Sequence, residues 1–249
     1  MRYSGRFCSR CDRGLVRKHN EDNVKIVLNS SGDVLLLVAD GIGGYTRGEV
    51  ASQIAIDVFV EAFLKKSRIC SVWEARRFIM KNLKIANKKI FNLAREIDEN
   101  EHMGTTLIGV LIARGKLFVF NIGDSRAYTF SNGKLKQISE DQTYVEFLVR
   151  TKQITKEEAK THPLRHVLNN ALGSNPSVNV DLHMYNYHGE TVFLCSDGLY
   201  NHVSDREIEA ILATTDNVEQ KTEILVTLAN NKGGTDNIAV ALWECDKND

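Results

Sequence analysis

The fold of this chain is decided by one stretch near its beginning: Val34-Leu35-Leu36-Leu37-Val38-Ala39, followed directly by Asp40-Gly41-Ile42-Gly43-Gly44. Six apolar residues in a row are typical of a short strand that is buried on both faces. The Asp-Gly step and the glycines after it end the run, because such residues favour turns. The stretch therefore predicts a buried strand that delivers a carboxylate, Asp40, at its C-terminal end.

Other short runs rich in apolar or β-branched residues predict further strands, several of them joined as hairpins. Residues 105–113 and 117–122 flank the turn at 114–116, and residues 127–130 and 135–138 flank Asn132-Gly133, a strong hairpin signal. Three more segments read as strands: 24–28, 191–195 and 238–243.

Helical spacing of apolar residues predicts helices in long blocks, at residues 48–66, 72–97 and 218–230. A shorter helix is predicted at 205–213, because Ser204 and Glu207 have the pattern of a capping box. Strands in hairpins and helices in blocks favour an α+β protein with antiparallel sheets and helices packed outside them. With two prolines and no linker-like composition, residues 1–249 are predicted to form a single domain.

Composition narrows the class of protein. Formal net charge is zero, with 32 basic and 32 acidic residues, which argues against a dedicated nucleic-acid binder. No apolar run approaches the roughly 20 residues of a membrane span, so no membrane partner is expected. The five cysteines are scattered. Cys8 and Cys11 have the spacing of one half of a zinc site, but no second pair follows. Reduced thiols in a cytoplasmic protein are the simplest interpretation.

The candidate chemistry lies in aspartates at the ends of predicted strands. Three of them follow a strand and two precede one: Asp40, Asp124 and Asp197, then Asp22 and Asp236. In antiparallel sheets these ends can meet at one edge, where five carboxylates would repel each other. Hard cations such as Mg²⁺, Mn²⁺ or Ca²⁺ accept an all-oxygen ligand set and would neutralise it. Each acid alone is better explained as a solvated turn residue, and only the five together indicate a divalent-metal site, without settling it.

The ordered motifs resemble a known family, the metal-dependent protein phosphatases (PPM, type 2C), in their compact bacterial form. They extend from about residue 10 to 243 and comprise 14–23 (GLVRKHNEDN), 38–44 (VADGIGG), 104–106 (GTT), 121–128 (NIGDSRAY), 171–173 (ALG), 194–199 (LCSDGL) and 233–238 (GGTDNI). The resemblance implies two stacked antiparallel sheets with helices on both outer faces, a four-layer αββα sandwich.

The resemblance also implies a role for each matching residue. Asp40 would bridge two metal ions, the Gly41 carbonyl would bind one of them, and Asp197 and Asp236 would bind the other. Asp22 would act through water, while Asp124 with Asp197 would form a weaker third site. Arg17 would grip the substrate phosphate, and the ions would be Mn²⁺ or Mg²⁺.

The implied function is hydrolysis of phosphoserine and phosphothreonine in proteins by a metal-activated water, in opposition to a serine/threonine kinase. We expect a monomer. Two alternatives remain open from the sequence: a non-catalytic relative that binds partners, and a phosphatase of small-molecule phosphoesters.

Residues 141–173 are expected to form a flap beside the cleft. There Gln142 departs from the Asp-His usual in many members of the family, which puts the contacts of the flap in question. Arg150 and Arg165 are candidates for contacts with acidic or phosphorylated substrate segments, and His162 is a candidate proton donor for the leaving oxygen. Cys195 is followed by Ser-Asp-Gly and not by a phosphate cradle, so we interpret it as a core thiol.

Overall fold

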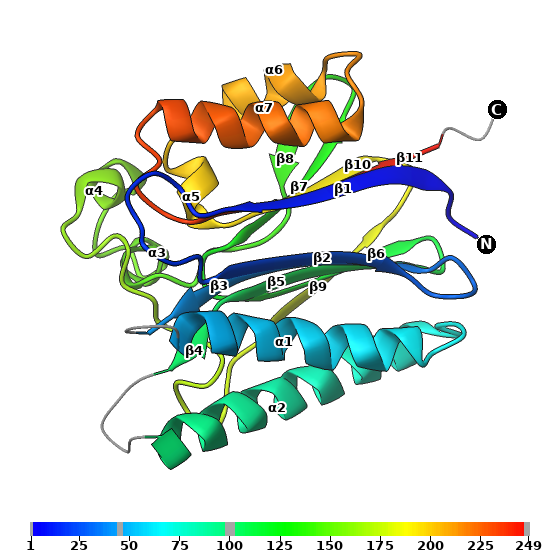
Figure 1. The fold of residues 1–249 in the computed structure, drawn as a ribbon, viewed down its shortest axis with the longest axis horizontal. Coiled ribbons are helices and arrows are strands. Elements are labelled where there is room, and N and C mark those ends of the chain that lie inside the picture. The colour runs from blue at the N-terminus through cyan, green and yellow to red at the C-terminus, as the bar shows by residue number, and fades with distance from the viewer. Residues whose placement is uncertain (1, 44–46, 98–102, 247–249) are drawn as a thin grey trace.

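The computed structural model describes residues 2–43, 47–97 and 103–246. Two antiparallel sheets are stacked face to face, and helices cover the outer face of each (Figure 1). The predicted α+β class and its four layers are thereby confirmed. Gly44, the last residue of the predicted DGIGG motif, lies outside the described residues.

The first sheet has the strand order β1-β11-β10-β7-β8. Its strands are β1 (Gly5–Asp12), β7 (Arg126–Ser131), β8 (Lys134–Gln137), β10 (Thr191–Cys195) and β11 (Ile238–Cys245). Strand β1 pairs with β11 along its whole length, from Gly5 opposite Cys245 to Asp12 opposite Ile238. Just beyond this pairing, the Ser4 hydroxyl donates to the Asp246 carboxylate at 2.6 Å.

The second sheet has the order β2-β3-β5-β6-β9, with β4 paired to the end of β3. Its strands are β2 (Asp22–Leu28), β3 (Val34–Ile42), β4 (Gly104–Thr105), β5 (Leu107–Ala113), β6 (Lys116–Ile122) and β9 (Asp181–Asn186). Strand β3 runs two residues past Asp40, so this aspartate lies within the strand and not after it. The predicted strand at 105–113 is split at Thr106.

Helices α1 (Arg47–Leu64) and α2 (Val72–Ile97) cover the second sheet, and α6 (Asp205–Leu212) and α7 (Val218–Asn231) cover the first (Figure 1). The predicted helix limits agree with these within two residues. The capping box at the start of α6 is present, with the Ser204 backbone N–H donating to the Glu207 carboxylate at 3.0 Å. None of the described helices is long and apolar enough to cross a membrane.

Strand β3 explains why one apolar run organises three layers. Val34, Leu36 and Val38 face the core between the two sheets, while Leu35, Leu37 and Ala39 face the core under α1 and α2. All six side chains are buried, as a strand covered on both faces requires. Strand β3 is therefore packed on both faces, and Asp40 has a defined position near its end.

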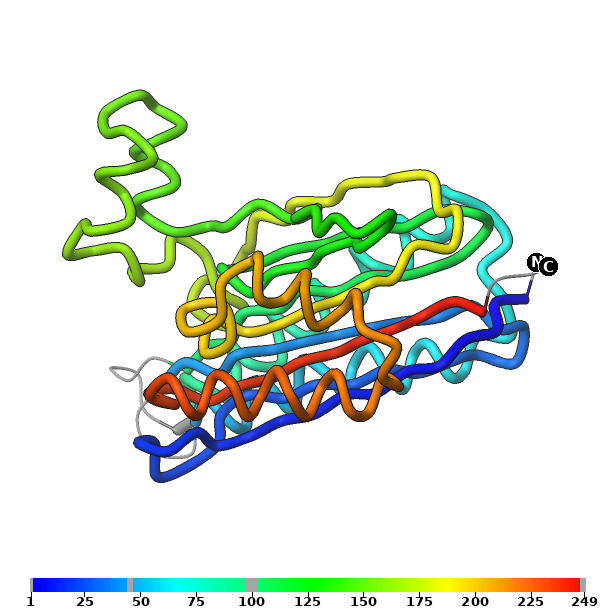
Figure 2. Tube along the Cα trace, turned by 90° about the horizontal axis from the view of Figure 1, so that it is seen from above, coloured from blue at the N-terminus to red at the C-terminus, as the bar shows by residue number. Residues whose placement is uncertain are grey.

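Two tight turns match the hairpins predicted from sequence. Arg114 and Gly115 have φ angles of 58° and 71°, and Asn132 and Gly133 have 52° and 72°. Positive φ at both central residues is the type I′ geometry that two-residue hairpins favour. By contrast, helices α3 (Tyr144–Arg150) and α4 (Lys156–Thr161) lie in a segment that projects away from the body (Figure 2).

Candidate metal and phosphate site

A cleft of about 760 Å³ opens at one end of the sandwich. Its lining includes four of the candidate aspartates and the candidate arginine, namely Asp40, Asp124, Asp197, Asp236 and Arg17. Asp22 is buried next to this group and does not line the cleft. The ends of strands from both sheets thus bring the predicted residues together.

Strand pairing accounts for much of this convergence. Asp22 opens β2 and lies directly opposite Asp40 of β3. In the other sheet, Asp197 follows β10 and Asp236 precedes the antiparallel neighbour β11, so both acids emerge at the same edge. The two sheets are joined here because the Ser196 hydroxyl donates to the Asp22 carboxylate at 2.6 Å.

The backbone of Asp40 is held on both sides by two threonines. Its N–H donates to the Thr106 hydroxyl at 2.9 Å, and its carbonyl accepts from the Thr105 hydroxyl at 2.9 Å and the Thr106 N–H at 2.8 Å. The break between β4 and β5 places these threonines beside β3. The Gly-Thr-Thr motif therefore positions Asp40.

Gly41 lies where two stretches of backbone nearly touch. A Cβ at this position would come within 2.2 Å of the Gly48 carbonyl oxygen and 2.6 Å of the Glu21 carbonyl oxygen. Only glycine fits such an approach. The start of α1 is thereby packed directly against the segment that carries the Gly41 carbonyl.

Burial and neighbouring charges raise the pKa values of several carboxyl groups in the acidic cluster. Burial, followed by repulsion from Asp197 and Asp236, raises the pKa of Asp22 to about 8, although the Ser196 hydrogen bond opposes the shift. Burial and the charge of Asp197 raise the pKa of Asp124 to about 7. The pKa of Asp40 is raised well above its usual range by burial and by the other four aspartates. Asp22, Asp40 and Asp124 are therefore close enough to other acids of the cluster for repulsion to disfavour their ionised forms.

This donor set fits hard divalent cations. Among the described residues, no three Asp, Glu, His or Cys side chains enclose one ion by themselves. Mg²⁺ typically takes one or two carboxylates and keeps several waters, so it does not need such an enclosure. Asp40, Asp197 and Asp236 are half-buried and open to the cleft, which leaves room for water and for the Gly41 carbonyl.

Arg17 lies at the cleft on the loop between β1 and β2. Its guanidinium donates to the Asp236 carboxylate at 2.7 Å, and its side chain is 52% exposed. The buried Asn237 amide fixes this loop, donating to the carbonyls of Arg13 and His19 and accepting from the Glu21 N–H. Arg17 is thus held beside Asp236 in the lining of the cleft.

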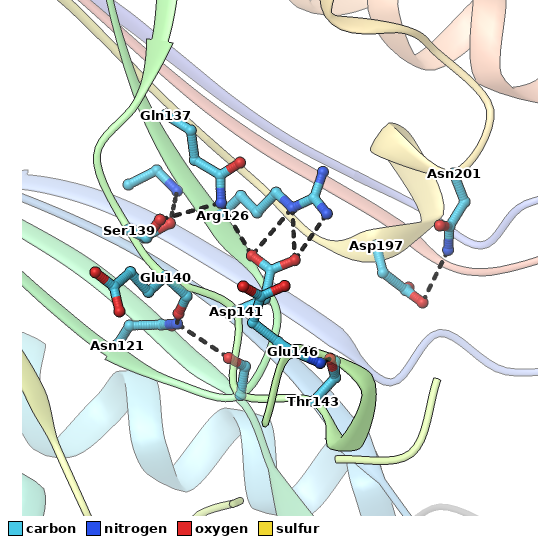
Figure 3. A network of polar contacts seen from close by, with 12 residues as sticks. Asn121, Arg126, Gln137, Ser139, Glu140, Asp141, Thr143, Glu146, Asp197 and Asn201 are labelled. Carbon is cyan, nitrogen blue, oxygen red and sulfur yellow. Dashed lines mark hydrogen bonds and ion pairs between the residues drawn. The ribbon is translucent and has the colours of Figure 1, made fainter. Parts of the chain in front are cut away.

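The base of the projecting segment is anchored beside Asp197. Arg126 donates to the Asp141 carboxylate three times, at 2.7 to 3.1 Å, and its guanidinium lies 3.6 Å from the centre of the Tyr200 ring. Tyr200 belongs to the short helix α5 (Asp197–Tyr200), which begins with the candidate ligand Asp197. Figure 3 shows the Arg126–Asp141 pair near Asp197 and Asn201.

Gln142 connects the projecting segment to the second sheet. Its backbone N–H and its side-chain oxygen both bond to Gly123, while its side-chain nitrogen donates to Asp181 at 2.8 Å. Asn170 donates to the same side-chain oxygen at 2.6 Å. Although Gln142 departs from the family pattern, its hydrogen bonds still make an ordered junction at this position.

His162 of the projecting segment was a candidate proton donor, whereas Cys195 was interpreted as a core thiol. The imidazole of His162 accepts from the Leu164 N–H at 3.1 Å and is not among the cleft-lining residues. His166 lines the cleft instead, and its charge opposes the rise in the pKa of Asp197. Cys195 is fully buried, and burial raises the pKa of its thiol, as expected of a core residue.

Several cleft residues were missed from the sequence: Glu21, Asn201, His166, Asn169 and Asn170. Asn201 could have been found, because it lies four residues after Asp197 and donates to its carboxylate at 3.1 Å. Glu21 is adjacent to Asp22, and burial raises its pKa. The other three come from a segment without periodicity, so the sequence carried no signal for them.

Known proteins share this fold and this sequence. The profile of the family described as "Protein phosphatase 2C" matches residues 15–232. The chain is 37% identical to a serine/threonine phosphatase, stp, of Listeria monocytogenes over 238 residues, covering 95% of this chain and 94% of the relative. It also superposes on the serine/threonine phosphatase of S. agalactiae with a TM-score of 0.92 at 30% identity, covering 98% of this chain and 100% of the other.

A further solved structure contains metal. The catalytic domain of the serine/threonine protein phosphatase PstP, in complex with 2 manganese ions, matches with a TM-score of 0.82 at 34% identity, covering 97% of this chain and 98% of the other.

The sandwich fold and its acidic cleft define a phosphatase of the metal-dependent PPM class. The chain belongs to the protein phosphatase 2C family, in the compact form of its bacterial relatives, and it is a protein phosphatase.

Proposed function

We propose that this phosphatase hydrolyses phosphoserine and phosphothreonine in proteins at a centre of two Mn²⁺ or Mg²⁺ ions, and that it opposes a serine/threonine kinase. The carrying observation is the set of five aspartates beside a cleft that also holds Arg17. Such a concentration of like charge favours bound cations, and a nearby guanidinium favours a phosphate ester.

The proposed ligand roles follow the positions of the acids. Asp40 would hold both ions, the Gly41 carbonyl would hold one of them, and Asp197 and Asp236 would hold the other. The placement of Asp40 supports the bridging role, because its carboxyl group feels the charge of every other aspartate of the cluster. When bound, the ions would activate a water for attack on phosphorus and offset the charge of the phosphate.

Asp22 and Asp124 are proposed to act at longer range. Asp22 is buried behind Asp40 and bonded to Ser196, which suits a residue that acts through water. Asp124 is 6% exposed and interacts with Asp197, so these two are proposed to hold a weaker third ion.

Arg17 is proposed to bind the substrate phosphate. One of its N–H groups is used by Asp236, and the planar guanidinium has further donors for phosphate oxygens. Residues 141–173 are proposed to act as a flap over the cleft, since His166, Asn169 and Asn170 line it. The enzyme is also proposed to be a monomer.

A phosphothreonine peptide assay with Mn²⁺ tests the proposal. We expect turnover that is abolished by chelator and by Asp40→Asn, and that is weaker on the matching phosphotyrosine peptide. Turnover that survives both treatments would disprove the metal mechanism. Absence of any metal-dependent turnover would favour a non-catalytic relative that binds partners. Hydrolysis of nucleotides or small phosphoesters alone would favour a phosphatase of small molecules.

A further inference from the structure

The outer face of α2 concentrates positive charge in a chain whose formal net charge is zero. Residues 65–97 contain ten of the 32 basic residues but only two of the 32 acidic ones, so the remainder of the chain has 22 basic and 30 acidic residues. The cations of α2 are exposed: Arg76, Arg77, Lys81, Lys84, Lys88, Lys89 and Arg95. This face is therefore a strongly cationic surface on an otherwise acidic molecule.

An apolar groove of about 480 Å³ runs beside this face, between α2 and residues 176–180. We call it the α2 groove. Met80, Leu83, Phe91 and Val178 contribute apolar lining, and Lys84 and Lys88 line it as well. No described acidic residue lines the groove, and the structure pairs neither lysine with a carboxylate among the described residues. Its chemistry suits a ligand with apolar side chains and negative charge.

The α2 groove is connected to the catalytic cleft by a short segment. Ser174 and Asn175 line the cleft, and the next residue, Pro176, lines the groove. Asn87 of α2, which is buried, fixes this segment: its amide nitrogen donates to the carbonyls of Asn175 and Pro176 at 2.9 and 3.2 Å, and its oxygen accepts from the Gly173 N–H at 2.8 Å. Residues 174–176 thus run directly from the cleft to the α2 groove.

We propose that the α2 groove docks an acidic segment of the phosphoprotein substrate, with apolar residues among the acids, that lies beside the phosphorylated residue. This inference rests on the proposed function. A strand advances about 3.3 Å per residue, so a few residues suffice to pass from the cleft over residues 174–176. Apolar side chains would enter the groove while carboxylates meet Lys84 and Lys88, and exposed charge pairs of this kind act mainly on encounter rate and specificity.

The shape of the site favours a polypeptide over an anionic membrane. A bilayer surface could meet the exposed lysines but could not fill a recess between α2 and residues 176–180. A cationic docking surface outside the cleft would also raise the encounter rate with an acidic segment of the substrate.

Steady-state kinetics with three peptides test the proposal. The first is a short phosphothreonine peptide; the second adds a flank of Asp, Glu, Leu and Phe, on either side of the phosphothreonine; the third replaces the acids of that flank by Asn and Gln. We expect the acidic flank to lower KM by about 3- to 10-fold with unchanged kcat, and this gain to vanish at 0.5 M salt.

Two variants with equal loss of charge separate the groove from general electrostatics. Lys84→Gln/Lys88→Gln should lose the KM advantage of the acidic flank. Lys134→Gln/Lys136→Gln, on the exposed strand β8 of the other sheet, should retain it. Both should hydrolyse p-nitrophenyl phosphate like the unmodified protein, because neither pair lines the cleft.

Binding of a fluorescent, unphosphorylated acidic flank peptide, measured by anisotropy, separates failure of docking from failure of the proposed function. Normal turnover of all peptides with equal KM, and no anisotropy change, would overturn the docking proposal and leave the phosphatase intact. Loss of all turnover with anisotropy retained would overturn the proposed function alone. Sedimentation with phosphatidylglycerol vesicles, without binding of the peptide, would identify the face as a membrane surface and overturn the proposal.

Discussion

The cleft and the outer face of α2 each gather charges of one sign, but they do so in different surroundings. Asp22 and Asp124 of the cleft are buried, and mutual repulsion adds to burial in raising their pKa values. Lys84 and Lys88 of α2 extend into solvent. In the cleft, the buried like charges therefore favour bound cations strongly. On α2, the exposed like charges only attract an acidic ligand weakly.

Asp40→Asn is the strongest test of this difference. Because the carboxylate is proposed to bridge both ions, we expect kcat/KM on a phosphothreonine peptide to fall about 1000-fold or more. In chelator, the same change removes one acid with a raised pKa, so the unfolding temperature should fall less between pH 4 and pH 8 than in the unmodified protein. A variant with full activity, or with an unchanged pH dependence of unfolding in chelator, would contradict this account of the cleft.

Arg17→Ala should cost about 10- to 100-fold in kcat/KM, since a charge-assisted phosphate contact is lost. Arg17→Lys retains the charge but not the planar guanidinium, so its kcat/KM should lie between those of the unmodified protein and Arg17→Ala. Initial rates at several peptide concentrations measure both. Equal rates for all three proteins would exclude a role for Arg17 in phosphate binding.

Asp141→Asn tests an ion pair that is less buried than the acids of the cleft and less exposed than the lysines of α2. Arg126 and Asp141 are 24% and 14% exposed, so the variant should lose about 1–2 kcal/mol of stability in urea unfolding, less than a fully buried pair would. Glu157→Gln is the control, because its pair with Lys160 is solvated and should matter by less than about 0.5 kcal/mol. If both changes altered the free energy of unfolding by a similar amount, the Arg126–Asp141 pair would contribute no more than a solvated ion pair.

The stability of the protein in chelator should depend on pH. The folded-state pKa values of Asp22 and Asp124, about 8 and about 7, lie above the ordinary value of 3.8. The folded state then binds more protons than the unfolded state, so stability falls as pH rises from about 4 to about 8. Unfolding temperatures across this range should decrease, and Mn²⁺ should raise them most at pH 8. A flat profile in chelator would show that burial and neighbouring charges do not raise the pKa values of these acids in the folded state.

Lys84→Gln/Lys88→Gln should have the smallest effect on stability. Exposed lysines without ion pairs contribute little, so urea unfolding should change by no more than about 0.5 kcal/mol. A larger loss would mean that this surface is built into the fold, in contrast to a solvated docking face.

The parts that could be predicted from sequence are those with strong local patterns. Strand β3 was predicted because its six apolar residues have no other plausible environment, and Asn132-Gly133 because few residues tolerate positive φ. The meeting of the aspartates followed from strand polarity alone. Their division into separate roles came only from the family resemblance, because sequence spacing does not reveal which acid faces which ion.

The missed elements lack such patterns. Strands β1 and β9 lie at sheet edges and carry many polar residues, so their apolar alternation is weak. The Arg126–Asp141 pair and the position of His166 depend on how an irregular segment folds back. Asn87 has no sequence signal at all, since its task is to bond a loop 86 residues away.

The pairing of β1 with β11 has a consequence for the order of folding. All strands of the second sheet are synthesised by Asn186, whereas the first sheet cannot be completed until β11 exists at residues 238–245. Strand β1 must therefore wait through nearly the whole of translation, and the Ser4–Asp246 bond closes a loop of 242 residues. We expect pulse-labelled hydrogen exchange to protect β3 and β5 before β1; simultaneous protection would argue against this order.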